Sequence, residues 1–177
     1  LNSDDIIDGK KSFLKFVWQS GQRDPVFIPK LVIHFFRDDA DGRKKGTAIV
    51  PLNYEKYGNE YIPNYPKPSN DYAYSVDAET LNKAMELISG DDKNKERYII
   101  LSCILEVISL DPDLSSFYNA SSRERDVYSV KLDETDFTNI KGGYGVFGVY
   151  TSAKWVARFK HAYIRSFGYT PGLSDPI

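Results

Sequence analysis

The sequence has little of what most metal sites and covalent crosslinks are built from. Among 177 residues it contains one cysteine, Cys103, and two histidines, His34 and His161, which lie far apart in the chain. A single cysteine excludes a disulfide within the chain, and a zinc site usually needs at least three protein ligands. No run approaches the roughly 18 apolar residues of a membrane-spanning helix, and no signal peptide is recognisable. We therefore expect no catalytic residue, no metal ion and no cofactor.

The chain also lacks a strong charge of either sign. Its formal net charge is -2, so no general basic field would attract nucleic acid or an acidic membrane. Aromatic residues are abundant at 14%, and tyrosine and phenylalanine favour strands and half-buried surfaces. The length suits one β-rich domain over residues 1–177. Because the chain starts at Leu1 instead of methionine, we expect further sequence upstream.

Alternating and β-branched apolar residues predict mainly antiparallel strands, arranged as a β-sandwich or a flattened barrel with one or two short helices. The charged turn at Asp41-Gly42 predicts a hairpin, and Pro29 marks a strand start, an edge or a bulge. A buried helix is the competing interpretation for residues 98–110, and residues 155–167 fit a helix or a bent strand. Residues 2–11 are expected to fray. The predicted strands are residues 12–19, 31–36, 47–52, 98–110, 127–132 and 141–150.

Two helices are predicted from their end signals. Residues 77–89 carry an apolar face at helical spacing, with Asp77 as N-cap and Gly90 as the stop. Asp111-Pro112 has the cap-then-proline order that begins a helix. This second helix is expected to be short and to end near Asn119.

Residues 53–74 combine three prolines with many tyrosines and asparagines, which predicts a long ordered loop with short extended pieces. Tyrosine rings offer flat apolar faces with a polar end, which suits protein interfaces and sugar stacking. The alternative is that these rings pin the loop onto the core of the domain. The candidate ligand or partner surface consists of Tyr54, Tyr57, Tyr61 and Tyr65.

The segment from Gly143 to Gly148 matches the G-x-G-x-x-G pattern of dinucleotide-binding sites. That pattern needs a helix after it and an acid about 20 residues on, and neither is expected here. We therefore interpret the glycines as structural. Gly142 and Gly143 permit a tight turn or bulge, whereas Gly145 and Gly148 let a neighbour approach closely.

The second half of the chain resembles a large family of Bacteroidetes envelope lipoproteins, catalogued as domain of unknown function 4249. The resemblance covers about residues 98–150, and includes the stretches ILEVISLDPDLSSFYNAS and FTNIKGGYGVFGVYTSAKW. Family members are typically longer at the N-terminus, so the resemblance implies a C-terminal part of a longer lipoprotein or a short divergent member. The residues that match the family's glycine motif are Asn139, Ile140, Gly142, Gly143, Gly145, Val146, Phe147 and Gly148.

The resemblance implies a non-enzymatic binding or accessory lipoprotein at the outer membrane, exposed at the cell surface and held by a lipid anchor upstream of this chain. It further implies the company of a TonB-dependent nutrient transporter or another envelope protein. The tyrosine-rich segment adds the expectation of a glycan or peptide ligand. Two alternatives stay open. One is a structural or adhesive, pilus-like surface protein that assembles through an exposed strand edge. The other is a hydrolase with a spatially assembled site that uses His34 or His161 with a carboxylate.

Overall fold

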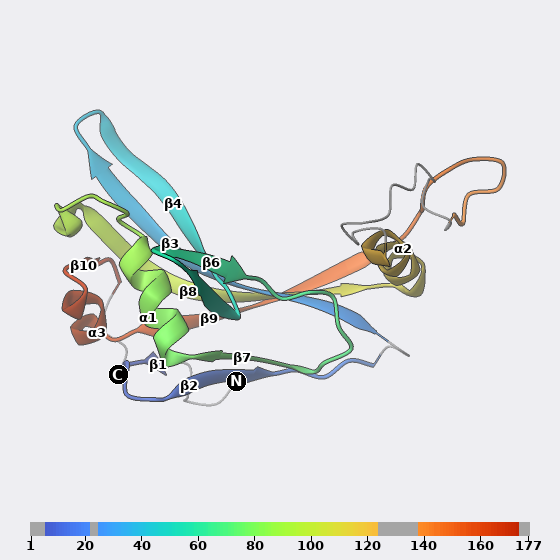
Figure 1. Cartoon of the computed structure of the whole chain (residues 1–177), viewed down its shortest axis with the longest axis horizontal. Coiled ribbons are helices and arrows are strands. Elements are labelled where there is room, and N and C mark those ends of the chain that lie inside the picture. Colours follow the sequence, from blue (N-terminus) through green and yellow to red (C-terminus); the bar gives the residue numbers. More distant parts are fainter. Residues whose placement is uncertain (1–5, 22–24, 124–137, 174–177) are drawn as a thin grey trace.

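The computed structural model describes residues 6–21, 25–123 and 138–173 of the chain. Its largest element is one sheet in the order β1-β9-β8-β3-β4, with β10 beside β8 (Figure 1). The three long pairings, β4 with β3, β3 with β8 and β8 with β9, are antiparallel, whereas the short β1–β9 and β10–β8 pairings are parallel. The strands of this sheet are β1 (Ile6–Ile7), β3 (Val26–Asp39), β4 (Gly42–Val50), β8 (Tyr98–Leu110), β9 (Tyr150–Phe159) and β10 (Thr170–Pro171).

Two antiparallel strand pairs and three α-helices complete the described structure. The predicted mainly β, sandwich-like fold is confirmed, and the sheets of the described residues do not close into a barrel. None of the helices described is long and apolar enough to cross a membrane. These elements are β2 (Phe13–Val17) with β7 (Ala73–Asp77), β5 (Asn53–Tyr57) with β6 (Glu60–Asn64), α1 (Ala78–Leu87), α2 (Pro112–Arg123), α3 (His161–Ser166) and the 3-10 turn η1 (Lys95–Arg97).

The core lies between one face of the large sheet and a second layer made by β2, β7, α1 and α3. Apolar side chains from both layers are removed from water there, which is the main favourable contribution to folding. The sheet contributes Leu31, Ile33, Ile100, Cys103, Leu105 and Val107, and the second layer contributes Phe16, Tyr74, Val76, Leu81, Ala84, Met85, Tyr163 and Ile164.

A β-bulge explains why β8 has a partly helical apolar spacing. The register between β3 and β8 shifts between His34 and Phe35, so that Leu101 has no partner across the ladder. Beyond the bulge the alternation changes phase, and Ile100 and Cys103 both face the core although they are three residues apart. The strand prediction for residues 98–110 is confirmed, and the helical alternative is wrong.

The β3–β4 hairpin is present but longer than expected. Asp39 pairs with Gly42, and β4 then continues through charged residues to Val50, which extends it well before the predicted start at residue 47. Cross-strand ion pairs support this charged end, for example Arg43 to Asp38 at 2.7 Å. Strand β3 also includes Pro29, which has no N–H to donate. Because β4 does not pair with this part of β3, the proline removes no hydrogen bond between β3 and β4.

Helix α1 begins and ends as its sequence predicts. The Asp77 carboxylate accepts a hydrogen bond from the Thr80 backbone N–H at 2.6 Å, and Gly90 follows the helix with a φ of 54°. Helix α2 is capped in the same way by Asp111, which accepts from the Leu114 N–H at 2.8 Å, and it extends to Arg123 instead of Asn119.

Several expectations from the sequence are corrected. Residues 53–74 do not form a long loop, because β5 and β6 make a hairpin there and β7 begins at Ala73. The predicted strand over 141–150 is a series of turns until β9 starts at Tyr150. Residues 155–167 divide between the end of β9 and α3. Ile6–Ile7 forms a strand in the segment expected to fray, and the predicted strand 127–132 lies outside the described residues.

Burial makes Cys103 a chemically protected thiol. Its side chain is fully buried in the core, and this desolvation raises the pKa of the thiol well above its ordinary value. We expect the native protein to resist a thiol-specific reagent at neutral pH and to react fully in denaturant. Rapid labelling of the folded protein, followed by absorbance, would contradict the core placement.

Met85 should contribute strongly to stability because it is fully buried between α1 and the sheet. Truncation of a buried side chain of this size, Met85→Ala, is expected to cost about 2–5 kcal/mol in the free energy of unfolding. Leu87→Ala is the matched control in the same helix, since Leu87 is 46% exposed and its loss should change stability by no more than about 0.5 kcal/mol. Urea denaturation measures both, and equal losses would argue against this packing.

Candidate functional site

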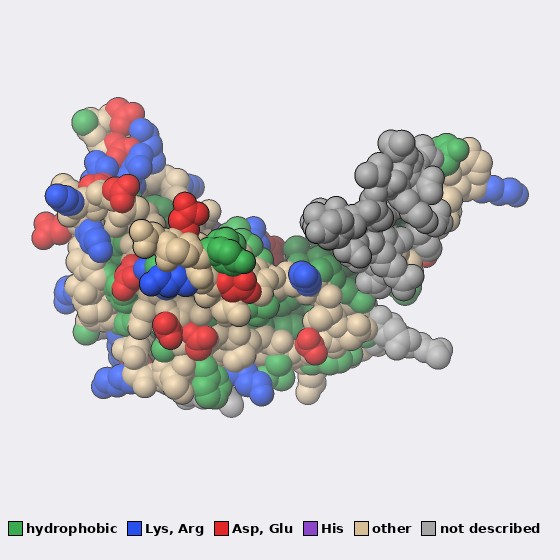
Figure 2. Space-filling model, viewed as in Figure 1, with side chains coloured by type: hydrophobic (Ala, Val, Ile, Leu, Met, Phe, Trp, Pro, Cys, Tyr) green, Lys and Arg blue, Asp and Glu red, His purple; other side chains and the backbone are tan. Residues whose placement is uncertain are grey.

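An open cleft of about 570 Å³ lies between the β5–β6 hairpin and α1. Figure 2 shows acidic and basic side chains gathered side by side over α1 on this face of the molecule. A volume of this size is within the range of small-ligand sites. The cleft is lined by Asn53, Tyr54 and Tyr61 from the hairpin, and by Asp77, Glu79, Thr80, Asn82, Lys83 and Glu86 from the end of β7 and from α1.

One contact orders the rings within the hairpin, and a second joins the hairpin to the helix. The Tyr54 and Tyr61 rings meet edge to face, with centroids 6.4 Å apart. The Lys83 ammonium lies 4.1 Å from the centroid of the Tyr61 ring and also pairs with Glu86 at 3.2 Å. A cation–π contact at an exposed position is worth about 0.5–1 kcal/mol. Lys83 therefore fixes one ring of the hairpin against α1 and occupies one face of that ring.

The polar face of α1 supplies most of the second wall. Glu79, Lys83 and Glu86 follow helical spacing on the side opposite the buried Leu81 and Met85, so they point away from the core, and Asn82 lies at the border of this side. With Asp77, three carboxylates face one ammonium, which gives the cleft a net charge of -3 + 1 = -2. Sequence reasoning missed these residues, although the polar stripe was readable from the same periodicity as the apolar one.

The four predicted tyrosines are not brought together. Tyr54 and Tyr61 line the cleft, whereas Tyr65 lines a different groove beside Pro29 and β7. Tyr57 is 73% exposed at the hairpin turn and lines neither. Tyr54 also packs against the core, and its partial burial raises the pKa of its phenol, which stays a neutral hydrogen-bonding group. The role of this set as a binding surface stays a prediction, and Tyr54 and Tyr61 are its best-placed members.

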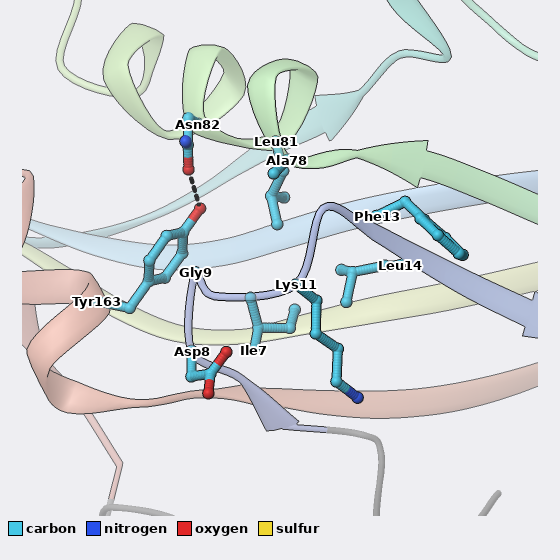
Figure 3. A pocket seen from close by; sticks show the side chains of 10 residues that line it. All are labelled: Ile7, Asp8, Gly9, Lys11, Phe13, Leu14, Ala78, Leu81, Asn82 and Tyr163. Carbon is cyan, nitrogen blue, oxygen red and sulfur yellow. Dashed lines mark hydrogen bonds between the residues drawn. The ribbon is translucent and has the colours of Figure 1, made fainter.

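Asn82 also lines a second, small pocket beneath α1, together with Tyr163 (Figure 3). The pocket holds about 10 Å³, which is room for one water at most. In it the Tyr163 hydroxyl donates to the Asn82 Oδ1 at 2.7 Å, and Gly9 packs on the tyrosine ring with a φ of 74°. Desolvation raises the pKa of the Tyr163 phenol, so it remains a donor. This bond uses the amide oxygen of Asn82, which also lines the cleft.

The glycine-rich segment 138–149 forms a turn-rich loop between α2 and β9. Gly142 and Gly145 have φ values of 76° and 102°, a region that favours glycine, and the Gly143 N–H donates to the Ile140 carbonyl. Gly148 packs directly on Leu114, where an added Cβ would collide. The structure thus agrees with close approach at Gly148. Gly145 instead has open space around it and is needed for its backbone conformation.

Two polar side chains hold this loop closed. The Asn139 amide accepts from the Phe147 N–H at 2.8 Å, and it donates to the Phe147 carbonyl at 2.6 Å and to the Asp113 carboxylate at 2.9 Å. Asp111 accepts from the Val149 N–H at 2.6 Å with the carboxylate oxygen that does not cap α2. The loop is therefore fastened to the start of α2 at both of its ends.

The histidines do not assemble a site in the described parts of the chain. His34 lines a shallow groove on the opposite face of the sheet, where the other lining residues include Lys45, Thr47 and Ser102 but no carboxylate. His161 begins α3 and bonds through its ring to the carbonyl of Leu173. Among residues 6–21, 25–123 and 138–173, no three His, Cys, Asp or Glu side chains are grouped as metal ligands would be.

Comparison with family models, curated proteins and solved structures found no match to this chain. Membership of the envelope lipoprotein family is thus still a prediction that rests on the residues of the resemblance.

Acid should loosen the loop at Asp111 before it unfolds the core. The backbone N–H groups of Leu114 and Val149 hold the pKa of the Asp111 carboxyl below its ordinary value near 3.8. A depressed pKa means that the stabilisation is present above the ordinary value and is lost as pH falls through the folded-state pKa. We expect the amide resonances of Leu114 and Val149 to titrate together with a midpoint below 3.8.

The control for this titration is Asp111→Asn, which keeps one acceptor but cannot ionise. In this variant the chemical shifts of the Leu114 and Val149 amides should not change over the same pH range. A titration that persists in this variant would assign the effect to another group.

Proposed function

We propose that this chain is a non-enzymatic binding module that takes a small polar ligand into the cleft between the β5–β6 hairpin and α1. The observation that carries the proposal is that the β5–β6 hairpin, the end of β7 and α1 bring two tyrosine rings and a row of amide and carboxylate groups to one open cavity. Convergent polar groups of this kind fix the orientation of a ligand.

The chemistry of the cleft favours an oligosaccharide, neutral or bearing amino groups. Carboxylates and amides at Glu79, Asn82 and Asn53 can each engage neighbouring hydroxyl groups, and the phenol of Tyr54 can donate or accept. The net charge of -2 disfavours an anionic ligand and favours a cationic one. A short basic peptide is the alternative ligand, because it would satisfy the same carboxylates.

In the same proposal the module belongs to a cell-envelope lipoprotein that serves nutrient uptake beside a TonB-dependent transporter. This part rests on the resemblance over residues 98–150. Gentle purification of the full-length protein from native membranes, followed by mass spectrometry, tests it. A transporter at fixed stoichiometry would support the accessory role, whereas a protein that is recovered alone and without a lipid would contradict it.

An adhesive, self-assembling role is the second candidate, and the edge of β9 favours it. Within the described residues, β1 pairs only with Arg158 and Phe159, which leaves the outer edge of β9 open from Tyr150 to Ala157. An open edge can accept a strand from another chain. Polymers of the pure protein in light scattering would support this role, and a monomer at high concentration would count against it.

Binding to the cleft can be tested by calorimetry and amide chemical shifts with a panel of neutral and amino-sugar oligosaccharides. We expect Tyr61→Ala and Glu79→Gln each to weaken binding by about tenfold, the effect of roughly 1.4 kcal/mol. Tyr57→Ala is the matched control, because Tyr57 lies on the same hairpin but does not line the cleft. Shifts that map outside the cleft, or equal binding by Tyr61→Ala, would contradict the assignment.

Tyr163→Phe should affect the same binding indirectly. Without the hydroxyl, the Asn82 amide loses the bond that fixes its orientation, so affinity should fall by a few fold although residue 163 does not line the cleft. The Asn82 side-chain NH₂ resonances should shift in the variant before any ligand is added. Unchanged resonances would show that Tyr163 does not position this amide.

A further inference from the structure

The far end of the molecule carries a cluster of exposed apolar side chains. Strands β8 and β9 lead away from the core to α2 and to the arm loop, defined as residues 138–150, at one end of the longest axis (Figure 1). In this loop Tyr144 is 84% and Phe147 is 78% exposed. The other exposed apolar residues of the loop are Ile140, Val149 and Tyr150.

Polar side chains of the arm loop are engaged in hydrogen bonds within the loop and to α2, whereas its large apolar side chains are left exposed. Asn139 and Asp111 use their side chains to close the loop, and Thr138 bonds within it through Oγ to the Ile140 N–H and the Gly143 carbonyl. These bonds hold Phe147 at an exposed position by binding its own backbone on both sides. Several large apolar side chains exposed on one constrained loop are a candidate interaction surface.

Charge distinguishes between the possible partners. Lys141 is the only charged residue from Thr138 to Tyr150, so the arm loop has a net charge of +1. At the start of α2, the Asp111 and Asp113 carboxylates accept hydrogen bonds from Val149 and Asn139. Aromatic rings with a lysine beside them are the composition that favours the boundary between lipid headgroups and acyl chains.

We propose that the arm loop is a peripheral membrane anchor that inserts Tyr144 and Phe147 into the interface of a lipid bilayer, with Lys141 at the anionic headgroups. The loop stands at one end of the longest axis (Figure 1), and a bilayer surface can receive such an end without a matching groove. Tyrosine suits this depth because its ring is apolar and its hydroxyl stays hydrated. With the arm loop inserted, α1 and the β5–β6 hairpin, which line the cleft, lie toward the other end of the long axis, away from the bilayer (Figure 1).

The test uses the full chain, without any lipid modification, and sedimentation with vesicles of phosphatidylcholine, with and without phosphatidylglycerol. We expect binding to both, and tighter binding to the anionic vesicles. The double variant Tyr144→Ser/Phe147→Ser should lose about tenfold or more in partitioning, since each buried apolar side chain contributes substantially. Tyr57→Ser is the matched control and should bind like the wild type, because it removes an equally exposed tyrosine from the hairpin.

Two further variants separate the electrostatic contribution to membrane binding from the contribution of apolar insertion. Lys141→Gln should weaken binding to anionic vesicles by about fivefold and leave neutral vesicles unchanged, the effect of one lysine near a charged surface. Phe147→Trp should keep binding and show a blue-shifted emission in the presence of vesicles, which reports burial of residue 147 itself. Circular dichroism of each variant establishes that the fold is retained.

The proposal is overturned if the wild type binds neither vesicle, or if the serine double variant binds as well as the wild type. It is also overturned if the wild type forms a dimer in solution that the same double variant disperses, because the occupant of the arm loop would then be a second copy of this chain. None of these results depends on the cleft, so the anchor can fail while the binding function stands.

Discussion

The antiparallel pairing of β3 with β8 is the constraint on which the rest of the structure depends. It runs for the whole length of β8, from Tyr98 to Leu110, and places β4 and β9 on its two sides. The core-facing residues of both strands, with Leu31, Ile33 and Leu105 almost fully buried, form the floor on which α1, α3 and the β2–β7 pair rest. Because this floor is apolar and continuous, the second layer can be assembled from short elements that would be unstable alone.

Local signals were enough to predict the elements that this floor requires. The apolar run of β8, the cap at Asp77 and the charged turn before Gly42 each specify their structure within a few residues. The β5–β6 hairpin was missed because its strands are mostly exposed and include Pro63, so neither alternation nor composition indicates them. The end of β9 was ambiguous because its apolar residues continue into α3 without a helix-capping side chain at Lys160.

Only one wall of the candidate cleft could be predicted from the sequence, and the reason is physical. Its tyrosines, Tyr54 and Tyr61, stand out in composition, because the segment 53–74 is unusually rich in tyrosine. Its second wall is the polar face of α1, and only the tertiary arrangement brings that face to the hairpin. The bond from Tyr163 to Asn82 spans 81 residues, so no local pattern could indicate it. Likewise, the glycine motif indicated a turn at Gly142 and a close approach at Gly148, but not that Phe147 is exposed to solvent between them.

The two surfaces differ in a way that argues against a common ligand. The cleft is concave and acidic, and Lys83 already occupies one face of its best-placed ring. The arm loop is apolar and weakly basic, and its polar atoms are used for its own closure. A ligand that binds the carboxylates of α1 has no polar group to bind at Tyr144 and Phe147. An apolar phase that receives those rings would not take up Glu79 and Glu86, because the free energy of desolvating their carboxylates is large and unfavourable. The fold therefore supports two separate contacts, with the rigid β3–β8 pair setting the distance between them.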